Sequence, residues 1–125
     1  MPKDFDDLPG SRAGSLTHKP YDLSLLEELE DEEQLRGIVD LFLTNTPLQL
    51  QELLTDAGKQ DWEKIAWHTH KLKSSAGVLQ ANGLLDLLRK IEEQAKLRKD
   101  PGLINGLLQD LMTAFSEVEI LLKKE

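Results

Sequence analysis

One short run of the sequence combines a titratable ring with cations and very small residues. His70 is followed by Lys71 and Lys73, and then by Ser74 and Gly77. At about 100° per residue in a helix, His70 falls on the side away from an apolar stripe. Lys73 lies one turn further on, and the two small residues share the face of His70. A neutral imidazole nitrogen is a nucleophile at physiological pH, so the pattern predicts an exposed reactive histidine that another protein can approach closely.

Two residues just before this histidine have other roles in the pattern. Trp67 lies about 60° round the helix from His70, so it either joins a docking surface, where aromatic rings are often hot spots, or packs against a neighbouring helix. His68 falls at the edge of the apolar stripe, and we interpret it as a half-buried structural histidine. Residues two apart on a helix do not face each other, and no third ligand is placed nearby. We therefore expect no metal site.

The elements that must position these residues are helices, because apolar residues recur near every 3.6 positions and no stretch alternates like a strand. A short first helix is expected at Ser24, with Ser24 as N-cap and Glu27 completing a capping box. Asp31 is expected to cap a second helix that extends to Gly58. The apolar register continues across Pro47, so we favour one long kinked helix over a new helix that starts at this proline.

Three further helices follow. Asp61 can cap the helix that carries His70, the pair Asn82-Gly83 can start the next, and Asp100 can cap the last, with Pro101 as its first residue. Long amphipathic helices joined by short turns predict an all-α fold, an up-down-up-down four-helix bundle with a short extra N-terminal helix. Residues 1–20, interrupted by proline and glycine, are predicted to be a flexible tail, and residues 21–125 the bundle.

Composition excludes several classes of protein. A chain of 125 residues without cysteine is expected to be a single domain with no disulfide and no thiolate zinc site. The net charge of −8 argues against nucleic acid and against an anionic membrane surface as partners. No apolar run reaches the roughly 18 residues of a membrane span, and no signal pattern is present, so we expect a cytoplasmic protein. Neither a Walker loop nor GxGxxG occurs, so the chain should not bind ATP or phosphorylate itself.

The run HKLKSSAG at residues 70–77 resembles the phosphoacceptor motif of histidine-containing phosphotransfer (HPt) domains. By spacing, the resemblance extends from Tyr21 onward and implies the same helical bundle. Two positions depart from the motif. Ser74 stands where glycine is usual but is still small, so access to His70 should survive. Gln80 stands where a second glycine is usual, and we expect it to affect how the helix ends.

The resemblance implies a phosphorelay intermediate and not an enzyme with its own kinase activity. His70 would accept a phosphoryl group from an aspartyl phosphate on a response-regulator receiver domain and pass it to another receiver, with a hybrid histidine kinase as a further partner. Lys73 would stabilise the added phosphate, and Glu92 on the next helix would orient His70. The alternative for Glu92 is a solvated pair with Lys96 at i+4. We expect a monomer without a cofactor of its own, with Mg²⁺ held by the receiver, and Trp67, Lys71, Ser74 and Gly77 forming the docking surface.

Other functions stay open on the sequence alone. A non-catalytic helical adaptor would bind a partner through the face of Trp67 and His70 without taking up phosphate. A hydrolase with His70 as general base would need a nucleophile and an oxyanion site, and only Ser74 is within reach. A histidine-kinase dimerisation domain would pair two long helices as a dimer.

Overall fold

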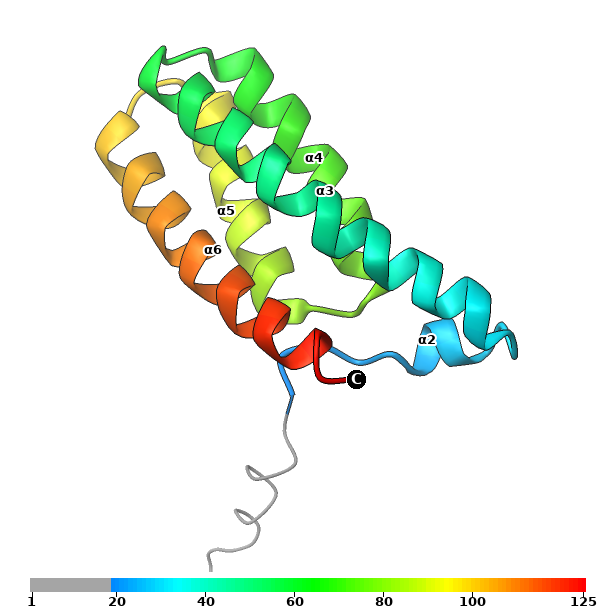
Figure 1. Cartoon of the computed structure of the whole chain (residues 1–125). Coiled ribbons are helices and arrows are strands. Elements are labelled where there is room, and N and C mark those ends of the chain that lie inside the picture. Colours follow the sequence, from blue (N-terminus) through cyan, green and yellow to red (C-terminus); the bar gives the residue numbers. More distant parts are fainter. Residues whose placement is uncertain (1–18) are drawn as a thin grey trace, which may run out of the picture.

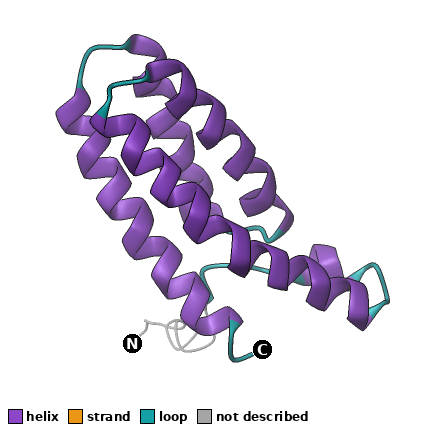
Figure 2. Cartoon of the chain, turned by 45° about the horizontal axis from the view of Figure 1, so that its top comes forward, coloured by secondary structure: helices purple, strands orange, loops and turns teal. Residues whose placement is uncertain are grey.

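The computed structural model describes residues 19–125, and this part of the chain folds into five helices without a strand (Figure 1). They are α2 (Ser24–Glu27), α3 (Glu32–Gly58), α4 (Trp62–Val78), α5 (Asn82–Leu97) and α6 (Pro101–Leu122). Helices α3 to α6 run alternately up and down, joined by short loops (Figure 2), while α2 lies beside the start of α3. The predicted bundle with a short extra helix is confirmed. Most of the predicted tail, residues 1–18, lies outside the described residues.

The predicted helix starts are correct for the three helices that have an aspartate as N-cap. Asp31, Asp61 and Asp100 are the N-caps of α3, α4 and α6, and each carboxylate accepts a hydrogen bond from a backbone N–H two or three residues further on. The prediction that Ser24 caps α2 is wrong. Ser24 is the first residue of α2, and its backbone N–H donates to Asp22 Oδ1 at 2.9 Å. The N-cap residue is Leu23, and no side chain caps α2.

Helix α3 continues through Pro47, as predicted from the apolar register. Proline cannot donate a backbone hydrogen bond, so packing must hold the helix together at this point. Leu50 and Leu53 are buried on the far side of the proline. Before it, the Phe42 ring meets the Phe115 ring of α6 with centroids 5.6 Å apart. Burial of this stripe, at about 25 cal/mol per Å² of apolar surface, offsets the lost bond.

Helix α4 packs against both α3 and α5. Its buried residues, which form the apolar stripe expected on the side away from His70, are Ile65, Thr69, Leu72 and Ala76. The hydroxyl of Thr69 donates to the carbonyl of Ile65 at 2.9 Å, so the polar member of the stripe is satisfied inside the helix. Because this stripe faces the core, the opposite face of α4, which carries His70, faces solvent.

The turn after α4 is built around Gln80, which has a φ of 52° in the left-handed region. Glycine is favoured in that region. Here the glutamine side chain adds contacts that a glycine lacks, because its amide nitrogen donates to the carbonyl of Asp22 at 3.2 Å and to the hydroxyl of Ser24 at 3.3 Å. The backbone N–H of Asp22 also donates to the carbonyl of Leu79 at 2.9 Å. The end of α4 is thereby joined to the segment that enters α2.

None of the helices formed by residues 19–125 is long and apolar enough to cross a membrane.

Candidate functional site

His70 lies on the outer face of α4, where 71 % of its side chain is exposed. The apolar stripe on the other side of the helix fixes this orientation. One edge of the ring approaches α5, with Nδ1 3.4 Å from Oε2 of Glu92. The structure therefore presents an imidazole to solvent while a carboxylate from the neighbouring helix faces one of its two nitrogens.

Glu92 is the centre of a charged cluster between α4 and α5. Its side chain is only 10 % exposed, and three basic groups approach it. Lys73 Nζ lies 2.7 Å from Oε1, and Lys96 Nζ lies 3.6 Å from Oε2, on the same oxygen that faces His70. Glu92 therefore contacts both His70 and Lys96, and its carboxylate is buried rather than solvated.

The environment of Glu92 keeps it ionised. Burial alone raises the pKa of this carboxyl, because it disfavours the charged form. The hydrogen bond and charge of Lys73, with the charges of Lys96 and His70, outweigh burial and hold the pKa of Glu92 below its usual range. At neutral pH the ring nitrogen of His70 thus faces an anion.

The surface beyond His70 is nearly free of side-chain bulk. Ser74 is exposed and Gly77 is half-buried, one and two turns further along α4. A Cβ atom added at Gly77 would meet nothing within 4 Å. Nothing in the described fold requires a glycine there, so its effect is to keep the surface open next to the histidine.

A comparison with protein families agrees with this geometry. A family model described as Hpt domain matches residues 37–118, which span most of α3, α4, α5 and most of α6. The chain belongs to the Hpt domain family. Such domains carry out histidine phosphotransfer in two-component signalling and are phosphocarriers rather than kinases. The family predicted from the motif at residues 70–77 is confirmed. No curated protein and no solved structure matches the chain.

Trp67 is an exposed residue of this Hpt domain, one turn before the histidine. Of the surface of Trp67, 58 % is open to solvent, so most of the ring is not packed between helices. Lys71 Nζ lies over the indole ring, 4.5 Å from its centroid. Lys71 therefore contacts the tryptophan, whereas Lys73 contacts Glu92, and the two lysines belong to different parts of the surface.

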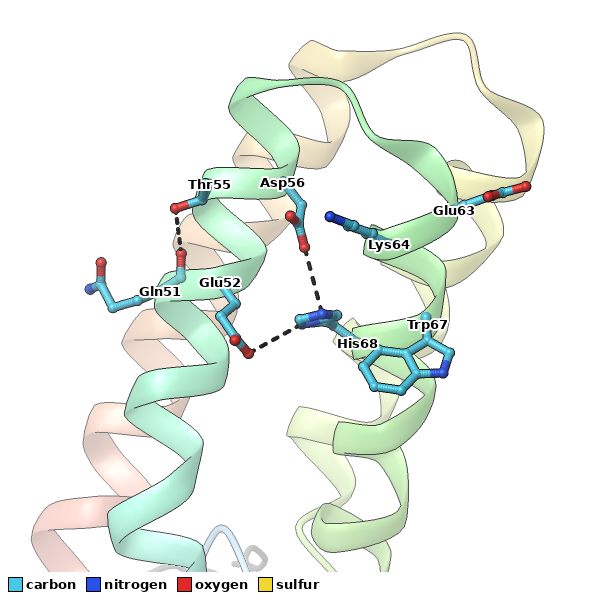
Figure 3. A pocket seen from close by; sticks show the side chains of 8 residues that line it. All are labelled: Gln51, Glu52, Thr55, Asp56, Glu63, Lys64, Trp67 and His68. Carbon is cyan, nitrogen blue, oxygen red and sulfur yellow. Dashed lines mark hydrogen bonds and ion pairs between the residues drawn. The ribbon is translucent and has the colours of Figure 1, made fainter.

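His68 of the Hpt domain is turned toward α3, with 13 % of its side chain exposed. Its Nδ1 lies 3.5 Å from Glu52 Oε1, and its Nε2 lies 3.8 Å from Asp56 Oδ2 (Figure 3). The burial agrees with the interpretation as a half-buried histidine, but sequence reasoning missed both carboxylates. Their i, i+4 spacing marks a shared face of α3, yet nothing in the sequence says that this face meets His68. Residues 19–125 contain no group of three or more His, Cys, Asp or Glu side chains that could hold a metal ion.

Proposed function

We propose that this Hpt domain is a phosphorelay intermediate in which His70 accepts a phosphoryl group from an aspartyl phosphate of one receiver domain and passes it to another receiver. The observation that supports the proposal most is the solvent-exposed imidazole backed by the buried, ionised carboxylate of Glu92. An acceptor needs access for its partner on one side and a fixed ring on the other. His70 has both.

The contact with Glu92 selects the nucleophilic nitrogen. A neutral imidazole carries one N–H, and a proton on Nδ1 faces the carboxylate at 3.4 Å. The lone pair is then on Nε2, which has no hydrogen bond or ion pair within residues 19–125. Nε2 forms a bond to phosphorus, the bond from phosphorus to the aspartyl oxygen breaks, and the aspartate leaves as a carboxylate. The ring gains positive charge in this step, and Glu92 stabilises that charge through Nδ1–H. Transfer to the second receiver is the reverse reaction.

Lys73 and Lys96 are the cations available for the phosphoryl group. Both lie against Glu92 in the free domain, at 2.7 Å and 3.6 Å. A phosphoryl group adds strong acceptor oxygens and negative charge, so it competes with the carboxylate for these ammonium groups. Each partly exposed contact contributes about 1 kcal/mol or less. Phosphoryl transfer depends mainly on positioning and charge stabilisation, and we place Mg²⁺ in the acidic pocket of the receiver, with no cofactor in this domain.

The same surface supplies the docking contacts. Trp67 and Lys71 lie on one side of His70, and Ser74 and Gly77 continue along the helix beyond it. We propose that a receiver covers this face, with the aromatic ring as an anchor and the small residues admitting its phosphorylated loop. The domain acts as a monomer in the cytoplasm, where it meets its receivers or a hybrid histidine kinase.

Labelling with a phosphorylated receiver tests the proposal. The wild-type domain should take up an acid-labile label, and His70→Gln should take up none while keeping the helical circular dichroism of the parent. His68→Gln is the matched control, because it removes a histidine from the same helix and should still be labelled. Full labelling of the His70→Gln variant would refute the proposal.

The exposed Trp67 also fits a second function, a helical adaptor that binds a partner without chemistry. The same experiment separates the two functions. An adaptor would form a complex with the receiver, as measured by calorimetry, and the histidine would remain unlabelled.

A further inference from the structure

A groove separates α3 from α4 near the start of α4. Its volume is about 760 Å³, and Figure 3 shows the side chains around it. Trp67 stands at its rim, and the ring of His68 extends into it toward α3. The remaining lining residues are Gln51, Glu52, Thr55, Asp56, Glu63 and Lys64.

The groove has an excess of negative charge, and one of its carboxylates is buried. Three carboxylates and one lysine line the groove, Glu52, Asp56, Glu63 and Lys64. The carboxylate of Glu63 lies 3.9 Å from Arg98, so Glu52 and Asp56 carry the unbalanced charge. Asp56 is 8 % exposed, and its Oδ2 has no hydrogen-bond partner among the described residues. Leaving a buried carboxylate oxygen without a partner is unfavourable, so this atom requires an explanation.

A neutral His68 cannot donate to both carboxylates that face it. Its two ring nitrogens point at Glu52 and Asp56, at 3.5 Å and 3.8 Å. A neutral imidazole has one N–H and one lone pair, so one of the two carboxylates faces a lone pair instead of a donor. Among the described residues Lys64 forms no ion pair with Asp56 or Glu52, and its ammonium group lies 4.0 Å from Asp61. With a neutral His68, the free domain holds a negative site, formed by Glu52 and the unpartnered oxygen of Asp56, that a cation from outside would complete.

The pair of carboxylates and the aromatic rim favour a guanidinium group over other cations. A guanidinium presents several N–H donors in a planar fork that matches carboxylates, and its flat face stacks on indole rings. Glu52 and Asp56 supply the carboxylates, and the exposed Trp67 supplies the ring. Lys71 Nζ lies 4.5 Å from the centroid of this ring, so the ring already contacts a cation in the free domain.

We propose that this groove binds an arginine side chain of the docking protein, held between Glu52, Asp56 and the Trp67 ring. Trp67 is three residues, about one helical turn, before His70, so a protein seated over the histidine can reach the groove. The identity of that protein as a receiver rests on the function proposed above. The proposal that the groove binds a guanidinium group does not depend on that function.

An arginine peptide tests the groove without any receiver. Acetyl-Gly-Arg-Gly-amide is titrated into the ¹⁵N-labelled domain, and the neutral isostere with citrulline is the control ligand. We expect the arginine peptide to shift the indole N–H of Trp67 and the amide of His68, and the citrulline peptide to leave both unmoved. Glu52→Gln and Asp56→Asn should each abolish the shifts. Because 61 % of the Glu52 side chain is exposed, Glu52→Gln keeps the test independent of folding. Asp110→Asn neutralises an exposed carboxylate on α6 and should change nothing.

Three results would overturn the inference. The first is equal shifts with the citrulline peptide, and the second is shifts that persist in Glu52→Gln. The third is a doubly protonated His68 in the free domain at pH 7.5, read from its ring ¹⁵N shifts, because both carboxylates would then already have a donor.

A receiver provides the second measurement. We expect Glu52→Gln to raise the KM for transfer from a phosphorylated receiver about three- to tenfold with kcat unchanged, as for the loss of a partly exposed ion pair. Asp110→Asn should leave KM unchanged. If His70 is labelled and KM does not move, the groove inference fails and the relay function stands. If His70 is not labelled, the relay function fails, and the peptide titration alone decides the groove.

Discussion

Replacing Glu92 separates its two roles, because glutamine keeps an acceptor for Nδ1–H whereas alanine removes it. In Glu92→Gln the amide oxygen can still orient the ring, but the negative charge 3.4 Å from Nδ1 is gone. Two unit charges at that separation interact by about 5 kcal/mol at an effective dielectric constant of ~20. Solvent around a ring that is 71 % exposed reduces this toward about 1 kcal/mol. A barrier higher by about 1 kcal/mol slows transfer about fivefold.

Rapid-quench measurement of label transfer from a phosphorylated receiver checks this value. Glu92→Gln should be about fivefold slower than the parent, and Glu92→Ala slower still, since the ring also loses its orienting partner. Both variants leave Lys73, only 27 % exposed, without its counter-ion, so denaturant unfolding must confirm that they are folded at the assay temperature. If folded Glu92→Ala transfers at the parental rate, then Glu92 neither orients nor stabilises His70 and the reasoning is refuted.

Three further outcomes follow from the same site. Lys73→Ala should shorten the lifetime of the phosphorylated domain about fivefold, for the loss of about 1 kcal/mol. Lys71→Ala is the control, because Lys71 lies over the Trp67 ring, and equal lifetimes in both variants would remove Lys73 from the mechanism. Gly77→Ala should stabilise the fold by roughly 0.5–1 kcal/mol, since a Cβ there meets nothing, while raising the KM for the receiver; an unchanged KM would show that close approach at this residue is not needed. Finally, the pKa of Glu92 is lowered from 4.5, so the stability it contributes is complete above about pH 4.5 and is lost as the pH falls through its folded-state pKa. Urea unfolding between pH 5 and pH 3 should show a shallower loss for Glu92→Gln, and parallel curves would contradict the linkage.

The fold followed from local features of the sequence. The caps at Asp31, Asp61 and Asp100 and the uninterrupted register across Pro47 are properties of single helices, so they are readable without tertiary structure. The wrong cap at Ser24 arose in a helix of four residues, because so short a helix has too little apolar periodicity to locate its first residue.

The site was predictable only in part. The exposed face of His70 follows from the period of one helix, and Glu92 was placed by resemblance to a family. Glu52 and Asp56 were missed because their meeting with His68 depends on the relative rotation of two helices. Core packing sets that rotation, and the spacing of residues within either helix does not encode it.

The hydrogen bonds of the Gln80 side chain after α4 affect where the domain can be truncated. The family match begins at residue 37, yet Gln80 holds the carbonyl of Asp22, and the neighbouring Tyr21 is 5 % exposed with its hydroxyl on Glu125. A fragment that begins at residue 37 would lack the segment around Tyr21 and Asp22. It would expose the surface that Tyr21 covers, and the Gln80 side chain would lose its hydrogen bonds to that segment. The packed structure of this domain therefore extends further toward the N-terminus than the family match.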